Sequence, residues 1–213
     1  AQSGFTGPAA IFEAPWGGFL GTYARAAPAP DELVRDLGAR HGIMRSGIKP
    51  YAACRDIHSS LDVILQARRV HDLGPDDIAR IAVRCIPEMI QMVGQVANPV
   101  TRLEAQLSLP YSIAVALVTG RASVAEYENS FLVNPAVQRL ARQVVMRADP
   151  DLPPDSEPHL VITTTDGRRI PGHVAYASGA PQNPLPPEAI VRKFENLAAR
   201  LLPSRQVQAL KED

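Results

Sequence analysis

The chain has 213 residues, of which 46% are hydrophobic, and its 22 Lys and Arg balance its 22 Asp and Glu. This length allows one or two domains, and the neutral balance gives no electrostatic signature of nucleic-acid or anionic-membrane binding. No apolar run reaches the ~18 residues of a transmembrane helix. With only two cysteines, no disulfide framework and no visible signal peptide, the composition predicts a soluble protein of the reducing cytoplasm.

Bulky apolar residues crowd the beginning of the chain. Phe12, Trp16 and Phe19 lie close together around two glycines, which predicts a surface that docks on a partner. The opening AQSG resembles the last turn of a helix that ends at Gly4. We therefore expect the chain to be a piece of a longer protein.

The run SGIKPYAACRDIHSSLDVIL, residues 46–65, concentrates the residues that could carry chemistry. They are Lys49, Tyr51, Cys54, Arg55, Asp56, His58 and Asp62. Pro50 favours an extended backbone at Lys49, and the apolar spacing after His58 predicts a helix over residues 58–71. A helix start suits a carboxylate ligand and a neutral imidazole, and Lys49 could add a full positive charge.

Two other interpretations of this run stay open. The same residues fit a solvated loop followed by a packed helix end, with no site at all. Cys54 and His58 have the i, i+4 spacing of a metal pair. Without a third and a fourth ligand nearby, we predict no metal there.

The second informative stretch is AQLSLPYSIAVALVTG, residues 105–120. Its apolar pattern predicts a helix that ends at Gly120, with a kink or break at Pro110. A kink there would turn Tyr111 and Ser108 away from an ordinary helical face, while Arg102 lies on the approach. The alternative for Tyr111 is a packed ring with its hydroxyl at the surface.

The remaining elements follow from local signals. We expect strands over residues 41–48, 81–86 and 144–148, with Cys85 in the core, and a helix over residues 135–142 capped by Asn134. Asp166-Gly167 predicts a hairpin between residues 159–165 and 168–177, with His159 and His173 as structural residues. A helix should follow with Ile190, Phe194, Leu197 and Leu201 on one face, and a last short helix should start at Pro203-Ser204. The fold class is α+β: a small mixed sheet with covering helices, and helical segments at both ends.

Five motifs together resemble the MmgE/PrpD superfamily of 2-methylcitrate dehydratases, cis-aconitate decarboxylases and related epimerases. In chain order they are SGFTGPAAIFEAPWGGF, KPYAACRDIH, AQLSLPYSIAVALVTG, TTDGRRIPGHV and NPLPPEAIVRKFENLA. They span nearly the whole chain. The resemblance implies an all-helical domain, built from an N-terminal half and a C-terminal tail, with an α+β lid domain inserted between.

The resemblance divides this chain into three parts. Residues 1–30 would end a helical-domain segment, residues 31–180 would form the lid, and residues 181–213 would return to the helical domain. The partner would be the N-terminal helical half of the same enzyme, which carries an Asp/Thr/His set in relatives. The resemblance also implies a homodimer, without nucleic acid, membrane or cofactor.

Residue by residue, Lys49 matches the lysine that opens the family's lid-side motif, and His58 matches a histidine of its dehydratase-like members. Tyr111 matches a tyrosine in the helix that faces the cleft. The decarboxylase branch places its histidine nearer the lysine, where this chain has Cys54, and this departure argues against decarboxylation. Cys54, Arg55 and Arg102 are assigned to substrate binding.

The expected function is that of a 2-methylcitrate dehydratase-like hydro-lyase of propionate metabolism. It would remove a proton next to a carboxylate of a small di- or tricarboxylate and release water. Lys49 would hold the carboxylate, and His58 or Tyr111 would serve as acid or base. The alternatives are a carboxylate epimerase or isomerase and a non-catalytic fragment, and two cysteines are too few to ligate an iron–sulfur cluster.

Overall fold

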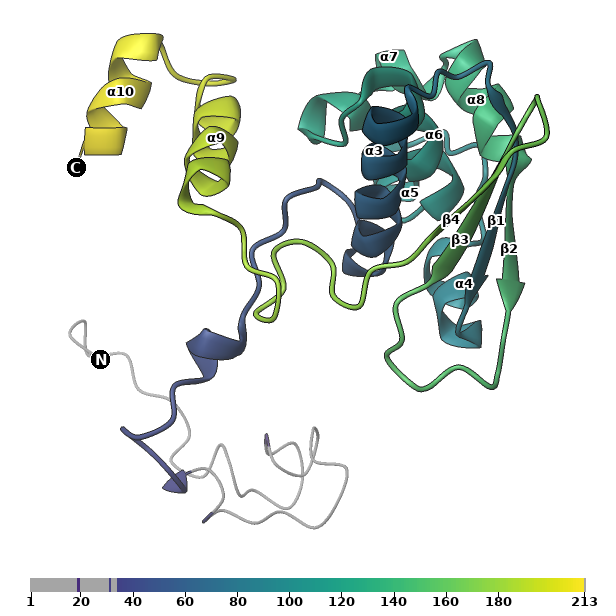
Figure 1. Ribbon diagram of the computed structural model, residues 1–213. Helices are drawn as coiled ribbons and strands as arrows, with labels where there is room; N and C mark the ends of the chain where they lie inside the picture. The colour runs from purple at the N-terminus through teal and green to yellow at the C-terminus, as the bar shows by residue number, and fades with distance from the viewer. Residues whose placement is uncertain (1–18, 20–30, 32–33, 213) are drawn as a thin grey trace. The chain divides into compact units, whose positions relative to one another are not determined.

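The computed structural model describes Phe19, Asp31 and residues 34–212. The chain forms two units, residues 1–45 and residues 46–213. The second unit holds a sheet with its covering helices (Figure 1). The apolar docking surface expected around Phe12 and Trp16 lies outside the described residues.

Four strands form one mixed sheet in the order β2-β1-β3-β4. They are β1 (Ile78–Cys85), β2 (Val144–Ala148), β3 (His159–Thr164) and β4 (Arg169–Gly172). β1 and β2 are parallel, and the other two pairs are antiparallel. The predicted small mixed sheet is therefore confirmed.

One face of the sheet is packed and the other is not. Ile81, Val83 and Cys85 alternate along β1 and are buried, and Leu160 and Ile162 do the same on β3. Figure 1 shows α3 (His58–His71), α6 (Leu109–Thr119) and α8 (Pro135–Gln143) on one side of the strands. The period-2 pattern thus marks the face that the helices cover, and the prediction of Cys85 as a core residue is confirmed.

The predicted hairpin is present, with Gly167 at a φ of 87° in its turn. A positive φ costs glycine little, so Asp166-Gly167 closes the turn. β4 ends at Gly172, earlier than the expected 177. At Gly172 the backbone passes α3 so closely that a Cβ would lie 2.2 Å from Val63 Cγ1.

The predicted helix over residues 58–71 is confirmed as α3. The predicted break before Pro110 is also confirmed, since α5 (Arg102–Gln106) stops and α6 begins at Leu109. The Ser108 hydroxyl caps α6 by accepting from the Tyr111 amide at 3.1 Å. Asn134 caps α8 in the same way, and α6 ends at Gly120 with a φ of 73°.

The predicted strand over residues 41–48 is wrong. Gly42–Arg45 form the 3-10 helix η1, with a local hydrogen bond from the Met44 amide to the His41 carbonyl at 3.1 Å. All side chains of η1 are exposed. The apolar residues of this segment therefore do not mark the buried face of a strand.

Short helices between the longer elements carry little sequence signal and were not expected. They are η2 (Arg55–Ile57), α4 (Pro87–Val93), η3 (Val124–Tyr127) and α7 (Asn129–Leu132). The two expected C-terminal helices are present as α9 (Pro187–Ala198) and α10 (Ser204–Glu212). Ile190, Phe194 and Leu197 recur along α9 and are 37–41% exposed, so this apolar face is only partly covered.

Candidate functional site

Lys49 and His58 converge on one backbone atom, the carbonyl oxygen of Ala53. Lys49 Nζ donates to it over 3.3 Å, and His58 Nε2 lies 3.3 Å from it. Pro50 and η2 bend the chain between them, so that residues nine positions apart meet. The Lys49 side chain is exposed, whereas His58 is fully buried at the first position of α3.

The hydrogen bond to Ala53 fixes the tautomer of His58. A carbonyl oxygen only accepts, so Nε2 carries the proton and Nδ1 keeps its lone pair. Nδ1 is buried and has no hydrogen-bond partner. Burial is the main reason that the pKa of His58 falls to about 4; the charges of Arg55 and Lys49 act in the same direction, while the Ala53 hydrogen bond and Asp62 oppose the shift. His58 is therefore a neutral imidazole at neutral pH.

The rings of Tyr51 and His58 pack in a T-shaped arrangement, with 5.2 Å between the centroids and 71° between the planes. Its hydroxyl donates to Asp62 Oδ1 over 2.6 Å. The second oxygen of the same carboxylate accepts from the Ser178 amide at 2.7 Å. Burial, and then the hydrogen bond to Asp62, raise the pKa of Tyr51 far above its ordinary value, so the phenol stays protonated.

Cys54 and Arg55 lie beside this pair. The Cys54 amide donates to the Gln106 carbonyl at 2.8 Å, and its thiol is half-buried and free. Arg55 pairs with Glu157 at 3.5 Å and lines a cleft of 690 Å³. Asp56, Glu88, Asp155 and Glu157 also line this cleft. Because carboxylates outnumber Arg55 there, the cleft does not favour an anionic substrate.

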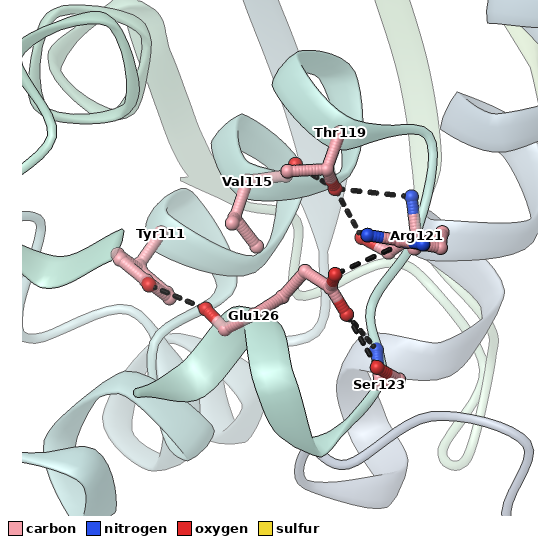
Figure 2. Close-up of polar contacts among 6 residues, drawn as sticks. All are labelled: Tyr111, Val115, Thr119, Arg121, Ser123 and Glu126. Atoms are coloured by element: carbon pink, nitrogen blue, oxygen red, sulfur yellow. Dashed lines mark hydrogen bonds and ion pairs between the residues drawn. The ribbon is translucent and has the colours of Figure 1, made fainter. Parts of the chain in front are cut away.

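Tyr111 lies on α6 and makes its hydrogen bond away from Lys49 and His58. Its side chain is 1% exposed, and its hydroxyl donates to the Glu126 carbonyl over 2.7 Å (Figure 2). Burial, followed by Tyr127 and Glu126, raises its pKa. The hydroxyl is thus neither at the surface, as the alternative interpretation had it, nor joined to the Lys49–His58 pair.

Glu126 itself anchors the turn after α6. Its fully buried carboxylate accepts from the Ser123 amide at 2.8 Å and from Arg121 Nε at 3.2 Å (Figure 2). Thr119 closes the end of α6 by donating to the Val115 carbonyl at 2.8 Å. These hydrogen bonds connect the end of α6 to the turn that follows it, so the polar groups around Tyr111 have a structural role. Arg102 begins α5 as an exposed residue.

Two histidines on the sheet have a different arrangement. His159 and His173 stack with 4.0 Å between centroids and 8° between planes. His173 Nδ1 also lies 3.2 Å from the Pro158 carbonyl oxygen. Burial, His173 and Arg84 lower the pKa of His159. The stacked geometry and the backbone contact fit the structural role predicted for both.

Two more residues join the site: Asp62, which the sequence places among the residues able to carry chemistry but without a role, and Ser178, which it does not indicate. Asp62 follows His58 by one helical turn, and this i, i+4 spacing is the signal that could have pointed to it. Ser178 carries no such signal, since it contributes its backbone amide across a long chain separation.

Two further features of the described residues concern metal binding and membrane insertion. No group of three or more His, Cys, Asp or Glu side chains in the described part of the chain could hold a metal ion. Over the same residues, no helix combines the length and the apolar character needed to cross a bilayer.

The α+β fold belongs to a recognisable class of domain. Residues 51–212 match the model of the MmgE/PrpD C-terminal domain. The chain belongs to the MmgE/PrpD family. It is also similar to a cis-aconitate decarboxylase of Aspergillus terreus, with 24% identity over an alignment that covers 100% of this chain and 47% of that protein. The chain thus spans about half the length of this curated relative.

Proposed function

We propose that this chain carries the lid-side half of the active site of a lyase that acts on a small di- or tricarboxylate. Family membership and the named activity of the Aspergillus terreus relative support a lyase. Within that class, we propose a 2-methylcitrate dehydratase-like hydro-lyase. A base takes the proton next to a carboxylate, the electron pair of that C–H bond forms the carbon–carbon double bond, and the hydroxyl group takes a proton from a general acid and leaves as water.

The convergence of Lys49 and His58 on the Ala53 carbonyl carries this proposal. The exposed ammonium of Lys49 can hold a substrate carboxylate and stabilise the negative charge that develops as the proton leaves. His58 is neutral and has an unused lone pair on Nδ1, which is the form that a general base requires. Because His58 is fully buried, substrate reaches Nδ1 only when the atoms that cover the ring move aside.

The other half of the site would come from the N-terminal helical half of the same enzyme, with residues 31–180 as the lid. The 47% coverage of the relative supports this division. The partly exposed apolar face of α9, with Phe194 and Leu197, supports docking of residues 181–213 on that half. We also propose a homodimer for the assembled enzyme.

A turnover assay tests the proposed activity. The chain is assayed alone and mixed with a helical-half protein from the same source, on 2-methylcitrate and citrate, by absorbance of the unsaturated product. We expect turnover only in the mixture, and a loss of about 100-fold or more in Lys49→Ala. Lys211→Ala, which removes an exposed lysine paired with Glu195, is the matched control. Equal turnover of the two variants would overturn the role of Lys49.

Decarboxylation is the second candidate, because the curated relative is named a cis-aconitate decarboxylase. In that reaction the bond to the carboxylate carbon breaks, carbon dioxide leaves, and the remaining carbanion takes a proton. The decarboxylase branch of the family has a histidine at the position where this chain has Cys54. This difference favours dehydration over decarboxylation. Supplying cis-aconitate and measuring carbon dioxide release separates the two, and release of carbon dioxide would overturn the hydro-lyase assignment.

An epimerase or isomerase would abstract the same proton without loss of water. In deuterated water such an enzyme exchanges the substrate proton for deuterium while the substrate keeps its hydroxyl. Silence of a folded mixture in all these assays would instead favour a non-catalytic fragment.

A further inference from the structure

Asp62 joins three segments that are distant in the sequence. It lies on α3, one turn after His58, and is half-buried. Its Oδ1 accepts from the Tyr51 hydroxyl at 2.6 Å, and its Oδ2 accepts from the Ser178 amide at 2.7 Å. Both oxygens of one carboxylate are therefore used, one by the segment before α3 and the other by the segment after β4.

These two segments also touch directly through their backbones. The Ile48 amide donates to the Gly179 carbonyl at 2.9 Å. A Cβ on Gly179 would lie 1.9 Å from the Ile48 carbonyl oxygen, and a Cβ on Gly47 would lie 2.5 Å from the Gly179 carbonyl oxygen. Glycine at both positions permits a backbone contact that any side chain would push apart.

Lys49 lies between two of these anchor points. On one side the Ile48 amide is bound to Gly179, and on the other the Tyr51 hydroxyl is bound to Asp62. Tyr51 in turn packs against the ring of His58. Thus the backbone of Lys49 is tied to the helix that carries His58 through the carboxylate of Asp62.

We propose that Asp62 is a positioning residue, which holds Tyr51 and Ser178 together and so fixes Lys49 relative to His58. This inference rests on the proposed function, which assigns Lys49 and His58 to the reacting site. Asp62 does not touch substrate in this scheme. It keeps the cation and the imidazole together at the shared Ala53 carbonyl.

The Tyr51–Asp62–Ser178 contacts form a clamp. Asp62→Asn tests this clamp by a measurement that does not depend on activity. An amide has an acceptor oxygen at one of these two positions and an NH2 group at the other, so it either loses the bond from the Ser178 amide or turns the Tyr51 hydroxyl from donor to acceptor, and both contacts lose the charge of the carboxylate. We expect hydrogen exchange of the Ile48 amide in the 213-residue chain, followed by NMR, to accelerate about tenfold. The Val83 amide on β1 should keep its rate, which shows that the sheet is intact. Asp56→Asn, the same change at an exposed carboxylate of η2, is the matched control.

Kinetics of the assembled enzyme then test positioning of the site. Asp62→Asn should raise KM about tenfold or more with a smaller fall in kcat, because Lys49 loses its fixed position for the substrate carboxylate. Asp62→Glu, which keeps two acceptor oxygens, should restore part of the loss.

The outcomes separate this inference from the proposed function. Unchanged exchange of the Ile48 amide in Asp62→Asn overturns the clamp, whatever the enzyme does. Faster exchange with no change in KM in an active enzyme overturns the positioning role. If no substrate is turned over but the amide exchanges faster, the clamp stands and the proposed function fails.

Discussion

The phenol of Tyr111 donates its proton to the backbone carbonyl of Glu126, which ties α6 to η3 through a buried hydrogen bond of 2.7 Å. Tyr111→Phe removes the donor and leaves that carbonyl without this partner. We expect the free energy of unfolding to fall by about 1–2 kcal/mol, measured by urea denaturation. Tyr176→Phe is the matched control, since Tyr176 is 51% exposed. An unchanged stability of Tyr111→Phe would contradict the structural role.

The buried imidazole of His58 makes stability depend on pH. Its pKa is about 4 in the folded chain against an ordinary value of 6.5, so the unfolded chain binds the proton more readily. The contribution of His58 is fully present above about pH 6.5 and is lost as the pH falls toward about 4. We expect a loss of up to about 3 kcal/mol across this window.

Urea denaturation at several pH values measures this loss, and an NMR titration of the ring gives the pKa directly. In His58→Gln the same window should show a flatter dependence, because the titrating group is gone. A His58 that titrates near its ordinary pKa in the folded chain would contradict the burial seen here.

Two glycines in the left-handed region form a matched pair. Gly179 and Gly167 have φ values of 83° and 87°, but a Cβ at Gly179 meets the Ile48 carbonyl oxygen, whereas a Cβ at Gly167 meets nothing within 4 Å. Gly167→Ala should cost about 1 kcal/mol from backbone strain alone. Gly179→Ala should cost clearly more, as seen in thermal unfolding, and equal costs would mean that the close approach does not occur.

The two thiols should react at very different rates. Burial raises the pKa of Cys85 to about 11, and its side chain is fully buried on β1. Cys54 is half-buried at the start of η2. A thiol reagent should therefore modify Cys54 first and Cys85 only on unfolding. Cys54→Ser is the control, and rapid labelling of this variant under native conditions would contradict the burial of Cys85.

Local signals predicted most of the fold. Asp166-Gly167 fixes a hairpin by turn chemistry, Asn134 caps a helix, and Pro110 breaks one, because each acts on its immediate neighbours. The alternation that ends at Cys85 identified a packed strand for the same reason. The strand predicted around Met44 was wrong because the apolar residues there have the pattern of a strand although all of them are exposed.

The site was predictable only in part. Lys49 and His58 lie close enough in the sequence for one run to place them together, and the structure does bring them to one carbonyl. Burial of His58 depends on how α3 packs, which no spacing within the run reveals. The Ser178 contact with Asp62 depends on the return of the chain after β4, so tertiary structure alone could show it.

The central position of β1 has a consequence for how the chain folds. Its parallel partner β2 arrives only after all of α4 to α8, whereas β3 and β4 are joined by a tight turn. Loop closure over so long a segment costs entropy before any pairing can repay it. We therefore expect the β3–β4 hairpin to form early and the docking of β2 against β1 to limit the folding rate. Until that step, the edge of β1 stays open to wrong partners.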